Sequence, residues 1–180
     1  YLISRSGFSK QGGFEIHTDN IEGALELYDY FFEIGKEFNL KPGTPNHPER
    51  IEGGLLSYGS DMDIFDNPFE CGFDKYVDLN SDIVFLGREN LIKIKEKGIN
   101  KKLMGVKIES KSIDVSQGIP MLDLKENEVG QLRSAAYSPK FNKVVGIAMI
   151  EKNFWEVAKK FKINIDGNFV SGEICNLPIV

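Results

Sequence analysis

Glu15 and His17 are the side chains whose type and spacing offer the clearest binding chemistry. They lie two residues apart in the segment Gly13–His17, and alternation along a strand places them on one face, with Phe14 and Ile16 on the other. A carboxylate held in a pocket can accept two N–H hydrogen bonds from an amino-pyrimidine edge. Taken alone, however, a glutamate at this place is more often simply an exposed strand residue.

Three further residues are candidates for ligand contact. Phe8 and Gln11 belong to the glycine-rich turn before that strand; the ring could stack on a ligand and the amide could contact one, although core packing and turn geometry explain them as well. Arg50 lies on an expected helix and does not face Glu52 there. Arg50 could brace Glu15 or a ligand, and an interdomain salt bridge is an equal alternative.

No residue is assigned to catalysis or to a metal. Cys71 and Cys175 have no nearby His or Asp pattern that would activate a thiol, and they form no C-x-x-C site or disulfide framework. The net charge of -5 argues against a nucleic-acid partner. The sequence has no apolar run of about 18 residues and no signal peptide. We therefore expect no membrane partner and a reducing, cytoplasmic location, while oligomeric state stays unassigned.

The segments that must position these residues change character near residue 100. Before it we expect strands at 1–4 and 13–17, helices at 21–38 and 48–58, a strand at 75–77 and a helix at 87–97. After it we expect a helix at 154–161 and strands at 103–108, 128–136, 144–150, 162–165 and 170–177. The sequence therefore predicts an α+β fold: a partial α+β domain over 1–100 and a small antiparallel β-barrel, sandwich or jelly-roll-like domain over 101–180.

The first residues suggest that part of the first domain is missing. Tyr1 is not Met and lies directly inside an apolar segment that is typical of a strand. A strand needs partners for its backbone N–H and C=O groups. We expect those partners to come from an N-terminal half that this chain lacks.

Six ordered motifs run along the whole chain: Arg5–Ile16 (RSGFSKQGGFEI), Arg50–Asp61, Asn67–Gly72, Phe85–Glu89, Gly130–Pro139 and Leu177–Pro178. Together and in this order they resemble the glycine-cleavage T-protein (aminomethyltransferase) superfamily. That resemblance implies a folate-binding ring of three domains, of which this chain would hold the second α+β part and the C-terminal β-domain.

Within the superfamily, the sequences of four segments resemble the branch that demethylates dimethylsulfoniopropionate. These segments are Ser9–Gly13, Gly35–Asn39, Glu49–Glu52 and Cys71–Val77. T-proteins usually carry Ala-Arg-Asp where this chain has Pro45-Asn46-His47, so Asn46 replaces an arginine that helps to hold folate. Phe8 stands where that branch typically has Trp, and His17 where it usually has Tyr. These departures leave room for an altered substrate preference.

The resemblance implies a chemistry and a set of ligand residues. Tetrahydrofolate would accept a methyl group from a small sulfonium substrate by direct transfer, giving 5-methyltetrahydrofolate and methylmercaptopropionate. The leaving thioether is neutral, so alignment and exclusion of water matter more than acid–base groups. The folate-binding residues would be Phe8, Gln11, Glu15, His17, Asn46 and Arg50, and Glu15 would accept from the pterin. We expect this chain alone to be inactive.

Three alternatives stay open. The first is an aminomethyltransferase that works with a lipoyl carrier protein, against which Asn46 weighs. The second is a non-enzymatic folate-binding protein of the iron–sulfur assembly type, whose Lys-Gly-Cys-Tyr-x-Gly-Gln-Glu motif matches neither cysteine here. The third is a standalone β-rich binding module.

Overall fold

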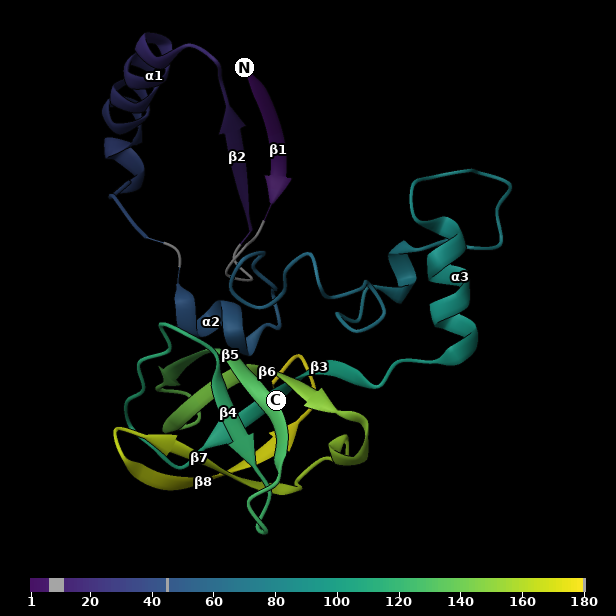
Figure 1. The fold of residues 1–180 in the computed structure, drawn as a ribbon. Coiled ribbons are helices and arrows are strands. Elements are labelled where there is room, and N and C mark those ends of the chain that lie inside the picture. The colour runs from purple at the N-terminus through teal and green to yellow at the C-terminus, as the bar shows by residue number, and fades with distance from the viewer. Residues whose placement is uncertain (7–11, 45, 180) are drawn as a thin grey trace. The chain divides into compact units, whose positions relative to one another are not determined.

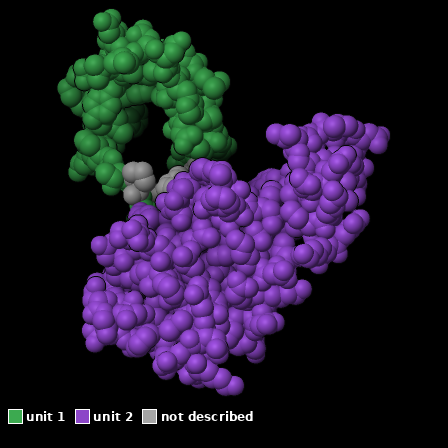
Figure 2. All heavy atoms as spheres, viewed as in Figure 1, with its two compact units in different colours: residues 1–46 green, residues 47–180 purple. Residues whose placement is uncertain are grey.

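The chain forms two compact units, Tyr1–Asn46 and His47–Val180, coloured separately in Figure 2. We call them the first unit and the second unit. The structure is a computed structural model that describes residues 1–6, 12–44 and 46–179. No helix of the described residues is long and apolar enough to cross a membrane.

The first unit begins with an antiparallel hairpin of β1 (Leu2–Ser6) and β2 (Gly13–His17) (Figure 1). Both strands were predicted, and their existence is confirmed. Ser4 lies opposite Glu15 in the register. The two strands form a sheet of their own, and a sheet of this size is only marginally stable in water without further packing.

Helix α1 (Ile21–Ile34) follows, and Asn20 caps it as its position predicts. The Asn20 Oδ1 atom accepts a hydrogen bond of 3.1 Å from the Gly23 N–H. The predicted helix to residue 38 is wrong in its last turn, which is the 3₁₀-helix η1 (Gly35–Phe38). The chain folds back there, and a Cβ at Gly35 would stand 2.6 Å from the Leu40 side chain. The close return of Leu40 therefore ends the regular helix.

The second unit starts with the short helix α2 (His47–Glu52). The helix predicted to reach residue 58 is wrong beyond Glu52, because Gly54 takes a positive φ of 64° and turns the chain. The strand predicted at 75–77 is also wrong. That segment is the 3₁₀-helix η2 (Asp74–Tyr76), whose turn closes with the Val77 N–H donating to the Asp74 carbonyl. Helix α3 (Arg88–Lys97) is as predicted and ends at Gly98.

The rest of the second unit is a closed barrel with the strand order β3-β6-β5-β4-β7-β8, in which every pair is antiparallel. Of the architectures predicted for 101–180, the barrel is the correct one (Figure 1). Its strands are β3 (Lys101–Ile108), β4 (Ile119–Leu122), β5 (Glu128–Ser138), β6 (Lys143–Glu151), β7 (Lys160–Ile165) and β8 (Asn168–Cys175).

Two features of the barrel differ from the sequence-based expectation. Strand β4 was missed, since it is only four residues long and contains Pro120. The helix predicted at 154–161 is wrong, since only the 3₁₀-helix η3 (Lys152–Phe154) forms before the chain enters β7. Ala158 has a φ of 66°, a left-handed conformation that cannot continue an α-helix.

Apolar side chains fill the barrel on the inside and cover part of its outer wall. The interior cluster includes Leu132, Ala148, Phe161 and Ile163, all fully buried. A second cluster lies on the outer wall, where Ile51 of α2 packs with Val145, Ile147 and Ile179. Helix α2 is therefore fixed to the barrel, and the polar side chains that it carries are fixed with it.

Candidate functional site

The predicted face of Glu15 and His17 exists on strand β2. Their side chains are 56% and 57% exposed, and Glu15 Oε2 lies 3.9 Å from His17 Nε2. Ser4, from the neighbouring strand, places its Oγ atom 3.4 Å from the same His17 nitrogen. The carboxylate is thus held beside two polar side chains and keeps an open side that can accept donors from a ligand.

For the other candidate ligand residues of the first unit, the structure gives few contacts. Phe8 and Gln11 lie outside the described residues. Asn46 is exposed at the end of the first unit. Folate contact by these residues, and by Glu15 and His17, stays a prediction.

Arg50 lies in a buried polar network of the second unit. Its side chain is 2% exposed, and Nη1 pairs at 2.6 Å with Oδ2 of Asp61, whose side chain is fully buried. Nη1 also donates to the Leu55 carbonyl at 2.9 Å, and Nη2 donates to Ser134 Oγ at 3.2 Å. The Ser134 hydroxyl in turn donates to Asp61. Arg50 therefore forms a buried salt bridge, but its partner Asp61 belongs to the same unit, so the pair is not the interdomain salt bridge of the alternative. A folate contact by Arg50 stays a prediction.

His47 completes this network at its exposed end. Its Nδ1 atom accepts from Arg50 Nε at 3.5 Å, so the ring proton belongs on Nε2. Burial of the ring lowers the pKa of His47, and the positive charge of Arg50 lowers it further against the opposing effect of Asp61. At neutral pH the His47 imidazole is therefore uncharged and offers one N–H donor.

A β-bulge places Arg133 beside this network. Leu132 opposes Ala148 in the β5–β6 register, yet the next paired residue, Ser134, opposes Ile147, so Arg133 is the extra residue. The bulge lets Leu132 point into the core while Ser134 reaches the buried Arg50 on the outer wall. Bulges of this kind re-aim side chains and recur next to active sites.

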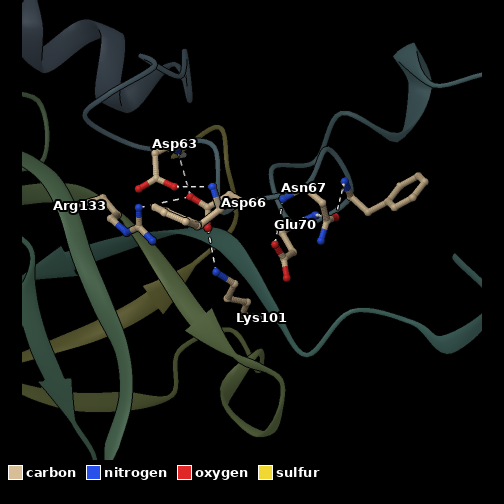
Figure 3. A network of polar contacts seen from close by, with 8 residues as sticks. Asp63, Asp66, Asn67, Glu70, Lys101 and Arg133 are labelled. Atoms are coloured by element: carbon tan, nitrogen blue, oxygen red, sulfur yellow. Dashed lines mark hydrogen bonds and ion pairs between the residues drawn. The ribbon is translucent and has the colours of Figure 1, made fainter. Parts of the chain in front are cut away.

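Asp66 holds Arg133 in place together with the start of strand β3 (Figure 3). The Asp66 side chain is 1% exposed, and its two oxygens contact Lys101 Nζ at 2.8 Å and Arg133 Nη1 at 3.3 Å. Burial alone would raise the pKa of Asp66, but the hydrogen bonds from Lys101 and from the Asp63 N–H, with the charges of Arg133 and Lys101, hold that pKa below its ordinary value. Asp66 is therefore ionised at neutral pH and compensates only one of the two cations.

Asn67 and Glu70 stabilise the same turn from its other side. Asn67 Oδ1 accepts from the N–H groups of Phe69 and Glu70 at 3.1 Å, and Glu70 accepts from the Asn67 N–H at 3.0 Å (Figure 3). Such reciprocal side-chain to backbone bonds fix the turn conformation. The motif residues of this turn thus fix the backbone next to Asp66.

A polar cleft of about 480 Å³ opens between these elements. Its walls are the β5 segment 131–135, the loop 113–118 before β4, the turn at Gly59 and Ser60, and His47. Arg133 is the cation among the cleft-lining residues. The cleft is built from side chains of several elements of the second unit.

The two cysteines do not contribute a nucleophile. Both are free and buried, and burial raises the pKa of each thiol to about 11, with Asp66 and Glu70 adding to the effect on Cys71. Their thiols are therefore protonated at neutral pH. Over the described ranges no three acidic, His or Cys side chains are grouped so that they could hold a metal ion.

Sequence reasoning missed four residues of this region: Gln131 and Arg133 on β5, and their neighbours Asp66 and Lys101. Gln131 and Arg133 lie inside the Gly130–Pro139 motif. The motif therefore identified the segment, but it did not predict the β-bulge at Arg133. Asp66 and Lys101 are 35 residues apart, and their contact depends on how the barrel closes. Asp61, at the end of the Arg50–Asp61 motif, forms a buried ion pair with Arg50.

The chain matches two models of one family. Residues 1–81 match the GCVT N-terminal domain, and residues 101–180 match the glycine cleavage T-protein C-terminal barrel domain. With the closed barrel and the ordered motifs, these matches identify the class: the chain belongs to the aminomethyltransferase, or glycine-cleavage T-protein, superfamily.

Individual relatives carry two different names. The chain is 36% identical to the dimethylsulfoniopropionate demethylase of Ruegeria pomeroyi, over 86% of this chain and 42% of the relative. It is 34% identical to the aminomethyltransferase of Thermotoga neapolitana, over 98% of this chain and 47% of the relative. The chain therefore spans less than half the length of these relatives.

A solved structure supports the fold. The glycine cleavage system aminomethyltransferase T from Bartonella henselae superposes with a TM-score of 0.84, at 21% identity, covering 99% of this chain and 49% of that one. At this identity the likeness establishes the fold alone.

Proposed function

We propose that the chain is part of a tetrahydrofolate-dependent methyltransferase that demethylates dimethylsulfoniopropionate. The observation that carries the proposal is the exposed Glu15 carboxylate on β2, in a motif that resembles the pterin-binding segment of the superfamily. The segments that resemble the demethylase branch, and the 36% identity to a demethylase, favour the sulfonium substrate.

The chemistry suits a site without a visible nucleophile. The bond between the sulfonium sulfur and the methyl carbon breaks with its electrons going to sulfur, and the carbon bonds to N5 of tetrahydrofolate, which then loses a proton. The products are methylmercaptopropionate and 5-methyltetrahydrofolate. In this scheme Glu15 accepts N–H donors of the pterin and orients N5, while Phe8, Gln11 and His17 also contact the ligand.

The remainder of the protein is the proposed partner. Almost all apolar side chains of the first unit are exposed, including Leu2, Phe14 and Ile21, and they offer a surface for an N-terminal half of the same protein. That half would supply the sulfonium pocket and complete the first domain, whose boundary with the barrel we place near residue 100. A cytoplasmic location accords with two free cysteines.

The aminomethyltransferase reaction is the second candidate. It is favoured by the name aminomethyltransferase that several relatives carry, among them the one from Thermotoga neapolitana. Asn46 in place of the expected arginine weighs against it. The full-length protein, obtained with its upstream coding sequence, should turn over dimethylsulfoniopropionate with tetrahydrofolate; turnover of an aminomethyl-lipoyl carrier protein instead would select the second candidate.

The role of Glu15 is tested by calorimetry on the same full-length protein. Glu15→Ala should weaken tetrahydrofolate binding at least about tenfold, since charge-assisted hydrogen bonds contribute about 1.5–3 kcal/mol. Glu26→Ala on α1, also an exposed glutamate, is the matched control and should bind as the parent does. Unchanged affinity in Glu15→Ala would remove Glu15 from the site. We also expect the isolated 180-residue chain to show no turnover, and measurable demethylation by it would contradict that expectation.

A further inference from the structure

The transfer chemistry of the proposed function leaves one proton without an acceptor. N5 of tetrahydrofolate carries a hydrogen, and when its lone pair bonds to the incoming carbon the nitrogen becomes a cation that must lose that hydrogen. The same loss occurs whether the incoming carbon belongs to a methyl or to an aminomethyl group. A side chain beside N5 that can take up this proton would complete either reaction.

His17 is the side chain of the first unit whose type suits that task. An imidazole is the side chain that exchanges a proton between pH 5 and pH 8 without special surroundings. His17 lies on β2 two residues from Glu15, and its ring is 57% exposed, so a ligand held by Glu15 can reach it. The chain's other histidine, His47, belongs to the second unit and holds its Nδ1 atom against Arg50.

Two oxygen atoms beside one ring nitrogen leave the other nitrogen for the ligand. Ser4 Oγ lies 3.4 Å and Glu15 Oε2 lies 3.9 Å from His17 Nε2, and both contacts of the ring with described residues are at this atom. A hydrogen on Nε2 is attracted by the Glu15 carboxylate and can be donated to Ser4, so the neighbours of the ring favour this tautomer. His17 Nδ1 then carries the lone pair that can accept a proton.

The same neighbours stabilise the ring once it is charged. An imidazolium at His17 would lie beside the Glu15 carboxylate, which is the acidic group within 4.0 Å of the ring among the described residues. Arg5 lies opposite Phe14 in the register and so belongs to the other face of the hairpin. A carboxylate beside an imidazolium stabilises its charge in catalytic triads. Glu15 has two oxygens with about four acceptor positions, so it can hold pterin N–H groups and compensate the imidazolium together.

The spacing on β2 lets Glu15 and His17 reach different parts of one ring system. Residues two apart on a strand are separated by roughly 7 Å, which is comparable with the width of a fused two-ring heterocycle. With the amino-pyrimidine edge on Glu15, the second ring of the pterin, which bears N5, can lie at His17.

A tyrosine, the residue usual at this place in the branch that the sequence resembles, lacks this capacity. A phenol loses its proton only near pH 10. It can therefore donate a hydrogen bond at neutral pH, but it cannot take up the N5 proton as an imidazole does. The histidine in this chain thus adds a chemical function to the position.

We propose that His17 is the proton acceptor for N5 of tetrahydrofolate. N5 bonds to the carbon of the donor, the leaving group of the donor keeps the electron pair of the broken bond, and the N5 hydrogen passes as a proton to His17 Nδ1. The imidazolium is stabilised by Glu15 and returns its proton to water after the product leaves. The assignment rests on the proposed function, because it requires tetrahydrofolate on Glu15.

The first test follows single turnovers of the full-length protein with tetrahydrofolate and dimethylsulfoniopropionate from pH 5 to pH 9. His17→Gln keeps an amide that can bond to Ser4 but cannot take up a proton. It should slow methyl transfer at least about tenfold and change the affinity for tetrahydrofolate less than about threefold. It should also abolish the fall in rate that the parent shows on the acid side of the profile, where the imidazole is already protonated. A parent-like rate and pH profile in His17→Gln overturn the proposal.

Rescue by free imidazole separates the chemistry of His17 from its shape. His17→Ala should be at least about tenfold slower than the parent, and added imidazole should restore most of that loss because it supplies the missing base. Glu15→Ala is the matched control: it loses the pterin anchor, which imidazole does not replace, so its rate should not rise. An unchanged rate of His17→Ala on adding imidazole overturns the proposal even if His17→Gln is slow, since a structural role of His17 produces that combination.

The outcome is separable from that of the proposed function. If the parent turns over dimethylsulfoniopropionate and His17→Gln keeps its rate, the proton acceptor is wrong while the proposed function stands. If the parent uses an aminomethyl-lipoyl carrier protein instead, the proposed donor is wrong, and slow His17→Gln with imidazole-rescued His17→Ala on that donor still supports the assignment. A parent without tetrahydrofolate-dependent turnover of either donor overturns both.

Discussion

The two units of the chain bury their apolar residues to opposite extents. In the second unit, the barrel encloses residues such as Phe161 and Ile163 completely. In the first unit, the buried positions among the described residues are the two glycines Gly23 and Gly35, while Phe14 is 72% and Ile21 79% exposed. Both units have regular secondary structure, so the difference lies in tertiary packing.

That difference separates a self-sufficient fold from one that depends on more protein. A closed barrel satisfies the backbone groups of every strand and has no free edge. Among the described residues, the hairpin of β1 and β2 pairs with no third strand, and most of its side chains are exposed. Ligand residues on the hairpin therefore depend on outside packing, whereas those on the barrel wall are fixed within the chain.

Dividing the chain tests the comparison most severely. Residues 47–180 expressed alone should fold cooperatively, with a melting temperature close to that of the parent, because their core lies within them. Residues 1–46 alone should show little helix or strand by circular dichroism, since helices of 14 residues are marginal in water without packing. A folded 1–46 peptide, or an unfolded 47–180 fragment, would contradict the comparison.

The buried ion pair of Arg50 and Asp61 should give the largest single-residue effect. Asp61→Ala leaves the Arg50 charge buried without its partner, which costs about 3–5 kcal/mol. Urea denaturation of the second unit measures the loss in unfolding free energy. Glu173→Ala breaks the partly exposed pair with Lys160 and serves as the control, with an expected loss below about 1 kcal/mol. Similar losses in both variants would show that burial does not govern this network.

The sequence correctly predicted the elements that are determined by local signals, such as periodicity and helix capping. Helix α3 and the hairpin strands have clear periodicity, and Asn20, directly before α1, caps that helix. Errors arose where a distant contact or a single φ decided the outcome. Leu40 returning onto Gly35 shortened α1, and the left-handed Ala158 replaced an expected helix by an entry to β7.

The candidate site residues also fall into two groups: those predictable from a local pattern and those that depend on a distant contact. The shared face of Glu15 and His17 follows from strand alternation, and the structure confirms it. Arg133 could not be found from periodicity, because the bulge at that residue shifts the register by one and turns the side chain to the outer wall. Its partner Asp66 is 67 residues away in the chain, so the pairing needs the closed barrel.

Two truncations extend the comparison to apolar side chains. Ile163→Ala removes a fully buried side chain from the barrel core and should lower the unfolding free energy by about 2–5 kcal/mol. Phe14→Ala removes an exposed side chain from the hairpin and should change it by less than about 0.5 kcal/mol in this chain. In the full-length protein the Phe14 variant should become clearly destabilising, because the proposed N-terminal half would bury that ring. Equal effects of Phe14→Ala in both contexts would remove the hairpin from that interface.

The smallest expected effect is a pH dependence confined to the second unit. The pKa of Asp66 is lower in the folded state than in the unfolded chain, so the folded state binds fewer protons there. The stability from Asp66 is therefore fully present above the ordinary Asp pKa of about 3.9 and is lost as the pH falls below it towards the folded value. Urea denaturation of residues 47–180 at pH 6 and pH 3 should show a loss of unfolding free energy that is smaller in Asp66→Asn than in the parent. Asp166→Asn, at an exposed turn between β7 and β8, should match the parent at both pH values. An identical pH dependence in Asp66→Asn and in the parent would mean that Lys101 and Arg133 do not stabilise the Asp66 carboxylate in solution, and would leave Arg133 without its anchor in the cleft wall.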